Sequence, residues 1–369
     1  MALLYLIFIL LTVLILSTWL LLKIRHADIW FISYIKGLVY IKPNSDKVKH
    51  IYICLADHYE PYFGQATQDH ARGLVDDWVK QYREISSKHS DSFGNPPQHS
   101  YFYPIEEYDA YVMDELSSIC KEKLGDVDIH LHHDDDNEKN LTKTLNNFKK
   151  LLFDRHQLLR KDNNGNIVYG FIHGNWALDN SRPDGKWCGV NNEIDVLVNT
   201  GCVFDMTMPS APSDTQTGKI NSVYFTSDDG KPKSHDKGWD AAVGKWGNNR
   251  ELLMIQGPLA FNWGKRNVGL IPKIETGELS FDAPPNLSRV KLWEKFGVSI
   301  KSAEEHIFIK LYTHGLQKKN MKMFFDNGGF EKLWTSLESE YKDKPGYKLH
   351  YVNAWEMYLK IKDISSDEY

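Results

Sequence analysis

The chain has few cysteines, and none of them lies at a spacing that indicates a metal or redox motif. The four, Cys54, Cys120, Cys188 and Cys202, are scattered over the sequence, without a CxxC pair. Long basic runs are also lacking, and 44 Lys and Arg against 49 Asp and Glu give a net charge of −5. Nucleic acid is therefore not an expected partner. The cysteine count does not decide the redox compartment.

One feature is long and unbroken. Residues 2–22 contain no charged side chain, and a helix of this length spans roughly 30 Å, the hydrocarbon thickness of a bilayer. A cleaved signal peptide would start with basic residues and end at small ones. A buried core helix is rarely so apolar on every face. We predict a retained single-pass membrane anchor over residues 1–25 and a cell-membrane location.

The segment after the anchor, residues 26–49, is basic. Lys23 and Arg25 directly precede it, its own basic residues are Lys36, Lys42, Lys47 and Lys49, and no Lys or Arg precedes the span. The positive-inside rule then favours a cytoplasmic domain, whereas action on a polysaccharide outside the cell would require the opposite side. Residues 29–35 are rich in aromatic side chains. They could lie in the headgroup region or form the first element of the soluble domain.

Residues 50–362 are predicted to form one α/β domain, followed by an acidic tail over 363–369. Short apolar runs alternate with helical patterns. The predicted strands cover 50–56, 101–105, 127–133, 168–173, 202–208 and 307–313, and the predicted helices 69–88, 110–123, 140–159, 191–199 and 321–341. This alternation indicates βαβ units and a parallel sheet. Residues 214–300 do not show this alternation clearly. They are either added loops and hairpins or a part of the barrel whose periodicity is not visible in the sequence.

Polar residues gather at the predicted carboxyl ends of the strands, where parallel α/β folds build their sites. Side chains alternate along a strand, so His130 and His132 share one face. Two imidazoles with Asp134 close behind suit a divalent metal such as zinc. The alternative is a polar strand end that is hydrogen-bonded to its neighbours.

Two further strand ends supply what a metal hydrolase needs besides these histidines. Asp57 could be a base or a ligand, and His58 a ligand. His314 could act as general acid toward the leaving group. The Trp176 ring could stack on a sugar. We assign substrate binding to Glu60, His173, Asn175 and Trp176.

At these positions the chain resembles the polysaccharide deacetylase group, the NodB-like carbohydrate esterases of the glycoside hydrolase/deacetylase barrel superfamily. Leu55-Ala56-Asp57-His58-Tyr59 is similar to its Thr-Phe-Asp-Asp-Gly motif, with Asp57 on the catalytic base and His58 on a metal-binding Asp. His130-Leu131-His132-His133-Asp134 lies near its His-Ser/Thr-x-x-His motif, with a different His spacing. Leu311-Tyr312-Thr313-His314 is similar to its Leu-x-His motif, one residue longer. The resemblance implies an irregular (β/α)-barrel of seven strands.

The expected function is that of a membrane-anchored, metal-dependent hydrolase that removes acetyl groups from a polysaccharide or lipid-linked glycan. Zinc is the expected cofactor, and the glycan and the membrane are the expected partners. Two alternatives remain. One is a glycosidase that uses two carboxylates, such as Asp57 with Glu60 or Glu106. The other is a glycan-binding or assembly protein without catalytic activity.

Overall fold

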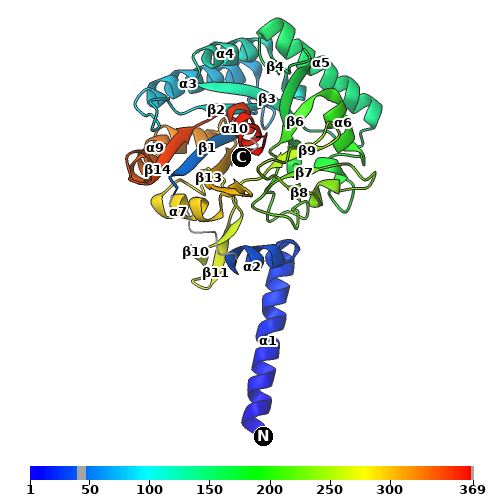
Figure 1. Ribbon diagram of the computed structural model, residues 1–369, viewed down its shortest axis with the longest axis vertical. Helices are drawn as coiled ribbons and strands as arrows, with labels where there is room; N and C mark the ends of the chain where they lie inside the picture. Colours follow the sequence, from blue (N-terminus) through cyan, green and yellow to red (C-terminus); the bar gives the residue numbers. More distant parts are fainter. Residues whose placement is uncertain (40–46, 367–369) are drawn as a thin grey trace.

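The computed structural model describes residues 1–39 and 47–366. Helix α1 (Ala2–Ile24) has no buried residue and leaves the domain as an isolated rod (Figure 1). Among the described residues, it is one helix long and apolar enough to cross a membrane. Its full exposure excludes a buried core helix, while a signal sequence would meet the same criteria of length and composition. Residues 40–46 and 367–369, parts of the predicted juxtamembrane segment and acidic tail, lie outside the described residues.

Two short helical elements connect α1 to the domain. They are the 3₁₀ turn η1 (Ala27–Ile29) and helix α2 (Phe31–Val39). Trp30 lies against Phe261, with ring centroids 4.7 Å apart, and Tyr34 stacks on Phe296 at 5.6 Å. Both rings are buried. The aromatic face of residues 29–35 is therefore the first packed element of the domain.

The domain is built on a sheet of twelve strands in the order β12-β13-β1-β2-β3-β5-β6-β9-β7-β8, with β14 on β1 and β4 on β5. The seven strands from β13 to β9 are parallel to their neighbours. They are β1 (Lys49–His58), β2 (His99–Pro104), β3 (Gly125–Leu131), β5 (Ile167–His173), β6 (Cys202–Asp205), β9 (Leu252–Ile255) and β13 (Ala303–Thr313). The others are β4 (Arg160–Lys161), β7 (Val223–Thr226), β8 (Trp239–Asp240), β12 (Val298–Ile300) and β14 (Tyr347–Tyr351). A separate hairpin pairs β10 (Ala260–Asn267) with β11 (Ile271–Glu275).

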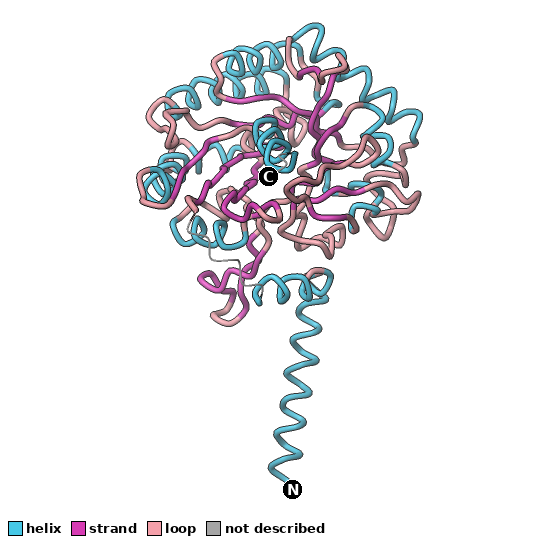
Figure 2. The backbone as a smooth tube through the Cα atoms, viewed as in Figure 1, coloured by secondary structure: helices cyan, strands magenta, loops and turns pink. Residues whose placement is uncertain are grey.

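Helices cover both faces of this sheet (Figure 2). They are α3 (Gln68–Ser86), α4 (Ala110–Lys121), α5 (Glu138–His156), α6 (Glu193–Thr200), α7 (Leu287–Phe296), α8 (Lys318–Phe324), α9 (Gly329–Leu337) and α10 (Ala354–Ser366). Strand alternation divides the core in two. Ile53 and Leu55 pack in one cluster with Trp78 of α3, and Cys54 packs in the other with Met357 of α10.

The α/β class and the parallel sheet are confirmed, but the closed barrel of seven strands is wrong. In the described part of the chain, the backbone pairing between the two ends of the sheet is limited to an isolated bridge between Ala242 and Lys301. The reason lies in residues 206–300, where β7 and β8 pair antiparallel instead of continuing the βα repeat. This region holds hairpins and loops and leaves the sheet open.

Candidate metal-binding site at the strand ends

Five side chains that can bind a metal converge at the carboxyl ends of three strands. His58 ends β1, and Glu60 follows it; His130 lies in β3, His132 follows that strand, and His314 follows β13. Ligand atoms of His58, Glu60 and His314 lie within 4.8 Å of one another, and so do those of Glu60, His130 and His132. Glu60 belongs to both groups. The site forms because neighbouring parallel strands bring their carboxyl ends to one edge.

Oxygen acceptors orient two of the imidazole rings. His130 donates from Nδ1 to the carbonyl oxygen of Ile172 at 2.7 Å, and His132 Nδ1 lies 2.6 Å from Glu106 Oε1. Their Nε2 atoms then face Glu60 Oε1 at 3.3 and 3.5 Å. An outer oxygen that fixes the tautomer of a histidine is the usual arrangement around a metal. This pattern favours cation binding over a hydrogen-bonded strand end.

Burial keeps two members of the site neutral. It lowers the pKa of His58 well below the usual value, and the neighbouring His314 and His130 lower it further. Burial also lowers the pKa of His314. Burial alone would raise the pKa of Glu60, but its hydrogen bond to His130 brings that pKa below the usual value. Neutral imidazoles beside an ionised carboxylate form a donor set that fits a divalent cation.

Asp57 lies on the opposite face of β1 from His58. Its Oδ1 accepts a hydrogen bond from the backbone N–H of Gly315 at 2.7 Å, and its Oδ2 lies 2.8 Å from His99 Nε2. The side chain is fully buried and belongs to none of the ligand groups found among the described residues. These contacts hold the turn that carries His314. The role of Asp57 as base stays a prediction.

The predicted ligand Asp134 is also absent from these groups. It is exposed, and its Oδ1 accepts a hydrogen bond from the backbone N–H of Trp187 at 2.6 Å. The structure therefore places it at the loop surface, whereas His58, His130 and His132 come together. Glu60, predicted as a substrate contact, is the residue that joins the two overlapping groups.

The loop after β5 carries the candidate substrate residues. The Trp176 ring lies 6.2 Å from the His58 ring and 6.3 Å from the His314 ring, and it is half-buried. Asn175 and Trp176 adopt left-handed φ angles of 53° and 56°. Gly174 allows this path because a Cβ there would lie 2.4 Å from the His132 ring. His173 is buried and belongs to a different ligand group.

Sequence reasoning missed Glu107, a possible acid at the same edge. Its Oε2 accepts a hydrogen bond from the backbone N–H of Tyr62 at 2.8 Å. Burial raises the pKa of Glu107 to about 7, opposed by that hydrogen bond. The pair Glu106-Glu107 after a strand was the available signal. A carboxyl group with a raised pKa can donate a proton near neutral pH.

Comparisons with known proteins are distant. No protein-family model and no curated protein matches the chain. Its fold is similar to a 4-alpha-glucanotransferase from Thermococcus litoralis, with a TM-score of 0.40 and 10% identity over 85% of this chain and 40% of that one. It is also similar to an alpha-mannosidase from Enterococcus faecalis, with a TM-score of 0.40 and 7% identity over 85% of this chain and 29% of that one. The chain thus spans less than half the length of either enzyme.

Proposed function

We propose that the chain is a membrane-anchored, metal-dependent hydrolase that removes acetyl groups from a polysaccharide or lipid-linked glycan. The observation that carries this proposal is the convergence of His58, His130, His132 and His314 on Glu60 at one strand edge. The anchor is supported by the exposed apolar helix α1. The glycan is supported by the Trp176 ring beside His58 and by the motif resemblance.

Glu60 with His58, or with His130 and His132, would hold the ion. A divalent ion there would lower the pKa of a water molecule and polarise a substrate carbonyl. Glu60 would accept a proton from the attacking water, and that proton would pass through the neutral His314 to the leaving oxygen or nitrogen. Asp57 would fix His314 through the Gly315 N–H. Water then adds to the acetyl carbonyl, and acetate leaves as the sugar regains its hydroxyl or amine.

The test uses the full-length chain in detergent. We expect Glu60→Gln and His130→Ala to lower metal affinity at least ~10–100-fold, because changes to groups that merely support a ligand already cost that much. Acetate release from acetylated oligosaccharides should fall in parallel. Glu84→Gln, a change at an exposed carboxylate of α3, is the matched control. A Glu60→Gln protein that keeps stoichiometric metal and full activity would overturn the proposal.

A glycosidase is the second candidate, and the raised pKa of Glu107 favours it. Glu107 would protonate the glycosidic oxygen while Glu60 acts as the second carboxylate. The two candidates give different products from the same glycan. Acetate without new reducing ends indicates the deacetylase, and new reducing ends without acetate indicate the glycosidase. In the glycosidase, Glu107→Gln should abolish activity without changing metal content.

A further inference from the structure

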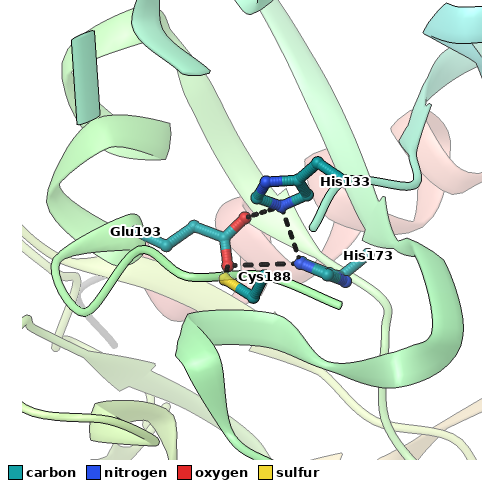
Figure 3. A group of neighbouring side chains, drawn as sticks. All are labelled: His133, His173, Cys188 and Glu193. Atoms are coloured by element: carbon teal, nitrogen blue, oxygen red, sulfur yellow. Dashed lines mark hydrogen bonds and ion pairs between the residues drawn. The ribbon is translucent and has the colours of Figure 1, made fainter. Parts of the chain in front are cut away.

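A second group of ligand-type side chains lies apart from the Glu60 site. It joins His133 after β3, His173 at the end of β5, Cys188 in the following loop and Glu193 at the start of α6 (Figure 3). One ligand atom from each lies within 4.8 Å of the other three. His173, Cys188 and Glu193 are fully buried, and the side chain of His133 is 7% exposed.

The two imidazoles face each other in an arrangement that needs a cation. His133 Nδ1 lies 3.1 Å from Asp136 Oδ2, and His173 Nδ1 lies 2.5 Å from the carbonyl oxygen of Gly174. These acceptors place the ring proton on Nδ1 in both residues. The neutral rings then direct two Nε2 lone pairs at each other across 2.9 Å. Such a contact is repulsive unless a cation lies between them, either a metal ion or the second ring proton of a charged His133, which Glu193 Oε1 and Asp136 Oδ2 would accept.

The other two groups add negative charge to the same point. Glu193 Oε1 lies 3.2 Å from His133 Nε2, and its Oε2 lies 3.4 Å from Cys188 Sγ. As a thiol, Cys188 donates to Glu193 Oε2, while the backbone N–H groups of Asn180 and Val190 point at its sulfur from 3.3 and 3.5 Å. Loss of the thiol proton to a bound ion would leave a thiolate that keeps both backbone donors. One carboxylate and one thiolate balance the charge of a divalent ion, which makes burial of the set tolerable.

We propose that His133, His173, Cys188 and Glu193 form a closed structural zinc site, separate from the Glu60 site. Two imidazoles, a thiolate and a carboxylate give the four donors that tetrahedral zinc accepts, and closed sites of this kind are structural. Asp136 and Gly174 are the outer partners that orient the histidines. Glu193 also accepts a hydrogen bond from the backbone N–H of Asp179 at 2.6 Å.

A zinc ion at this site would hold the loop between β5 and α6 in one conformation. This loop has left-handed φ angles at Asn175, Trp176, Asp179, Asn180 and Trp187, a conformation that is unfavourable for residues other than glycine. A zinc ion bound to His173, Cys188 and Glu193 would hold the loop at both ends and near its middle. It would thereby fix Trp176 beside His58.

The experiment uses cobalt as the probe metal in the full-length chain. Stripped protein refilled with Co²⁺ should show a thiolate-to-cobalt charge-transfer band, which only a cysteine ligand produces. Cys188→Ser should abolish the band and remove one bound ion per chain. Cys120→Ser, at a half-buried cysteine outside the group, should keep both. Glu60→Gln should keep the band even if it loses the other ion, so failure of this site and failure of the proposed function are distinguishable.

Absence of the charge-transfer band in the unmodified chain overturns the zinc site, even if Cys188→Ser does not fold. A protonated His133 would then be the cation between Glu193 and Asp136. A band that survives in a folded Cys188→Ser protein also overturns the site, because the thiolate would come from another cysteine.

A different surface carries a second proposal, which rests on the membrane anchor. Helix α2 turns by about 100° per residue, so Ile32, Ile35 and Val39 lie opposite the buried Trp30 and Tyr34. All three are exposed. The tip of the β10–β11 hairpin exposes Trp263, Val268 and Leu270, at 55, 86 and 78%.

The hairpin lies next to the end of the span. Arg25, which caps α1, donates to the carbonyl oxygen of Pro272 in β11 at 2.9 Å. In Figure 1 the hairpin reaches past α2 in the direction of the α1 N-terminus. Lys265 and Arg266 flank its apolar tip. We propose that the outer face of α2 and this tip lie in the headgroup region of the membrane that α1 spans, where tryptophan and basic side chains are favoured.

A fluorophore on Val268→Cys, in the Cys120→Ser background, tests this contact. The full-length chain is reconstituted in phosphatidylcholine–phosphatidylglycerol vesicles that contain a headgroup nitroxide lipid. We expect quenching at least several-fold stronger than for the same fluorophore on Glu84→Cys of α3. Equal quenching at the two positions would overturn the proposal.

Discussion

Lys310 of β13 is a buried cation beneath the candidate site. Its side chain is 1% exposed, and its Nζ donates to the carbonyl oxygen of Met206 at 2.8 Å. Burial lowers the pKa of Lys310 to about 8, although the charge of Asp205 opposes the change. Burial likewise raises the pKa of Asp205 to about 7, opposed by its hydrogen bonds to Thr207. The sheet therefore disfavours the charged form of each group.

This shift predicts a pH-dependent stability. The unfolded chain holds the Lys310 proton up to a pKa near 10.5, whereas the folded chain releases it near 8. The folded state is therefore more stable when Lys310 is neutral. This stabilisation is fully present above pH 10.5 and is lost as the pH falls through about 8. Lys310→Met should therefore flatten the rise of the free energy of unfolding between these values.

Urea unfolding of the full-length chain in detergent, at a series of pH values, measures this effect. Lys319→Met is the control, because it removes a lysine at an exposed position of α8 and leaves the buried Lys310 in place. An unchanged pH profile for Lys310→Met relative to this control would contradict the prediction.

The sequence indicates which residue types form the site, but not all of its geometry. His58, His130, His132 and His314 could be identified from their place at strand ends, and the structure brings these four together around Glu60. Asp57 and His58 are adjacent on one strand, so they cannot face the same site. The side of the sheet that the helices cover decides whether Asp57 or His58 points into the site. The local sequence does not show which side that is.

The second group lacked any local signal. Cys188 and Glu193 lie within reach of His133 because the loop after β5 folds back against the loop after β3, where the Asp136 N–H donates to the carbonyl oxygen of Cys188 at 3.0 Å. Spacing rules work for ligands on one loop or hairpin. They do not apply when the ligands come from two different connections, the one after β3 and the one between β5 and α6.

At the scale of elements, the turn after β13 positions His314. A Cβ on Gly315 would lie 2.3 Å from Asp57 Oδ2 and 2.6 Å from the Trp78 ring. Gly315→Ala must therefore displace the turn, and overpacking of this kind costs ~1–3 kcal/mol in the free energy of unfolding. We expect hydrolytic activity to fall at least ~10-fold, because a small misplacement of a catalytic group has large effects.

Gly73→Ala in α3 is the matched control, since nothing lies within 4 Å of a Cβ there. It should stabilise the helix slightly, because glycine costs a helix ~0.5–1 kcal/mol relative to alanine. Thermal unfolding and activity are measured on both variants. Full activity in Gly315→Ala would show that the position of His314 does not matter for turnover.

Long periodic elements were predictable and short ones were not. Helices α3, α4 and α5 lie within a few residues of their predicted ranges, because each shows a full apolar stripe. Strand β14 and helix α10 were not predicted at all. The antiparallel strands β7 and β8 are only four and two residues long, too short for a period to be visible.

At the scale of the molecule, the anchor and the domain are separable. Deleting residues 1–21 removes apolar surface that is not buried, while it keeps Leu22 and Arg25, which contact the domain. We expect this truncated chain to fold, to keep its melting temperature within a few degrees, and to wash off membranes in high salt. Thermal unfolding measures the folding and the melting temperature, and membrane fractionation measures the release in high salt. A truncated chain that stays in the membrane after the wash, even when Val268 and Leu270 of the hairpin tip are replaced by Ser, would contradict a single anchor.

The central strand of the sheet has consequences for how the chain is made. β1 begins at Lys49, and β2 pairs only with its last three residues, Ala56 to His58, whereas β13 and β14, which pair with the rest of it, lie between residues 303 and 351. The strand nearest the anchor must therefore wait until nearly the whole chain has left the ribosome. During that interval most of β1 stays apolar and unpaired, so that it can pair with other chains. Biogenesis of this protein should depend on a chaperone or translocation factor that shields β1 until the last strand is synthesised.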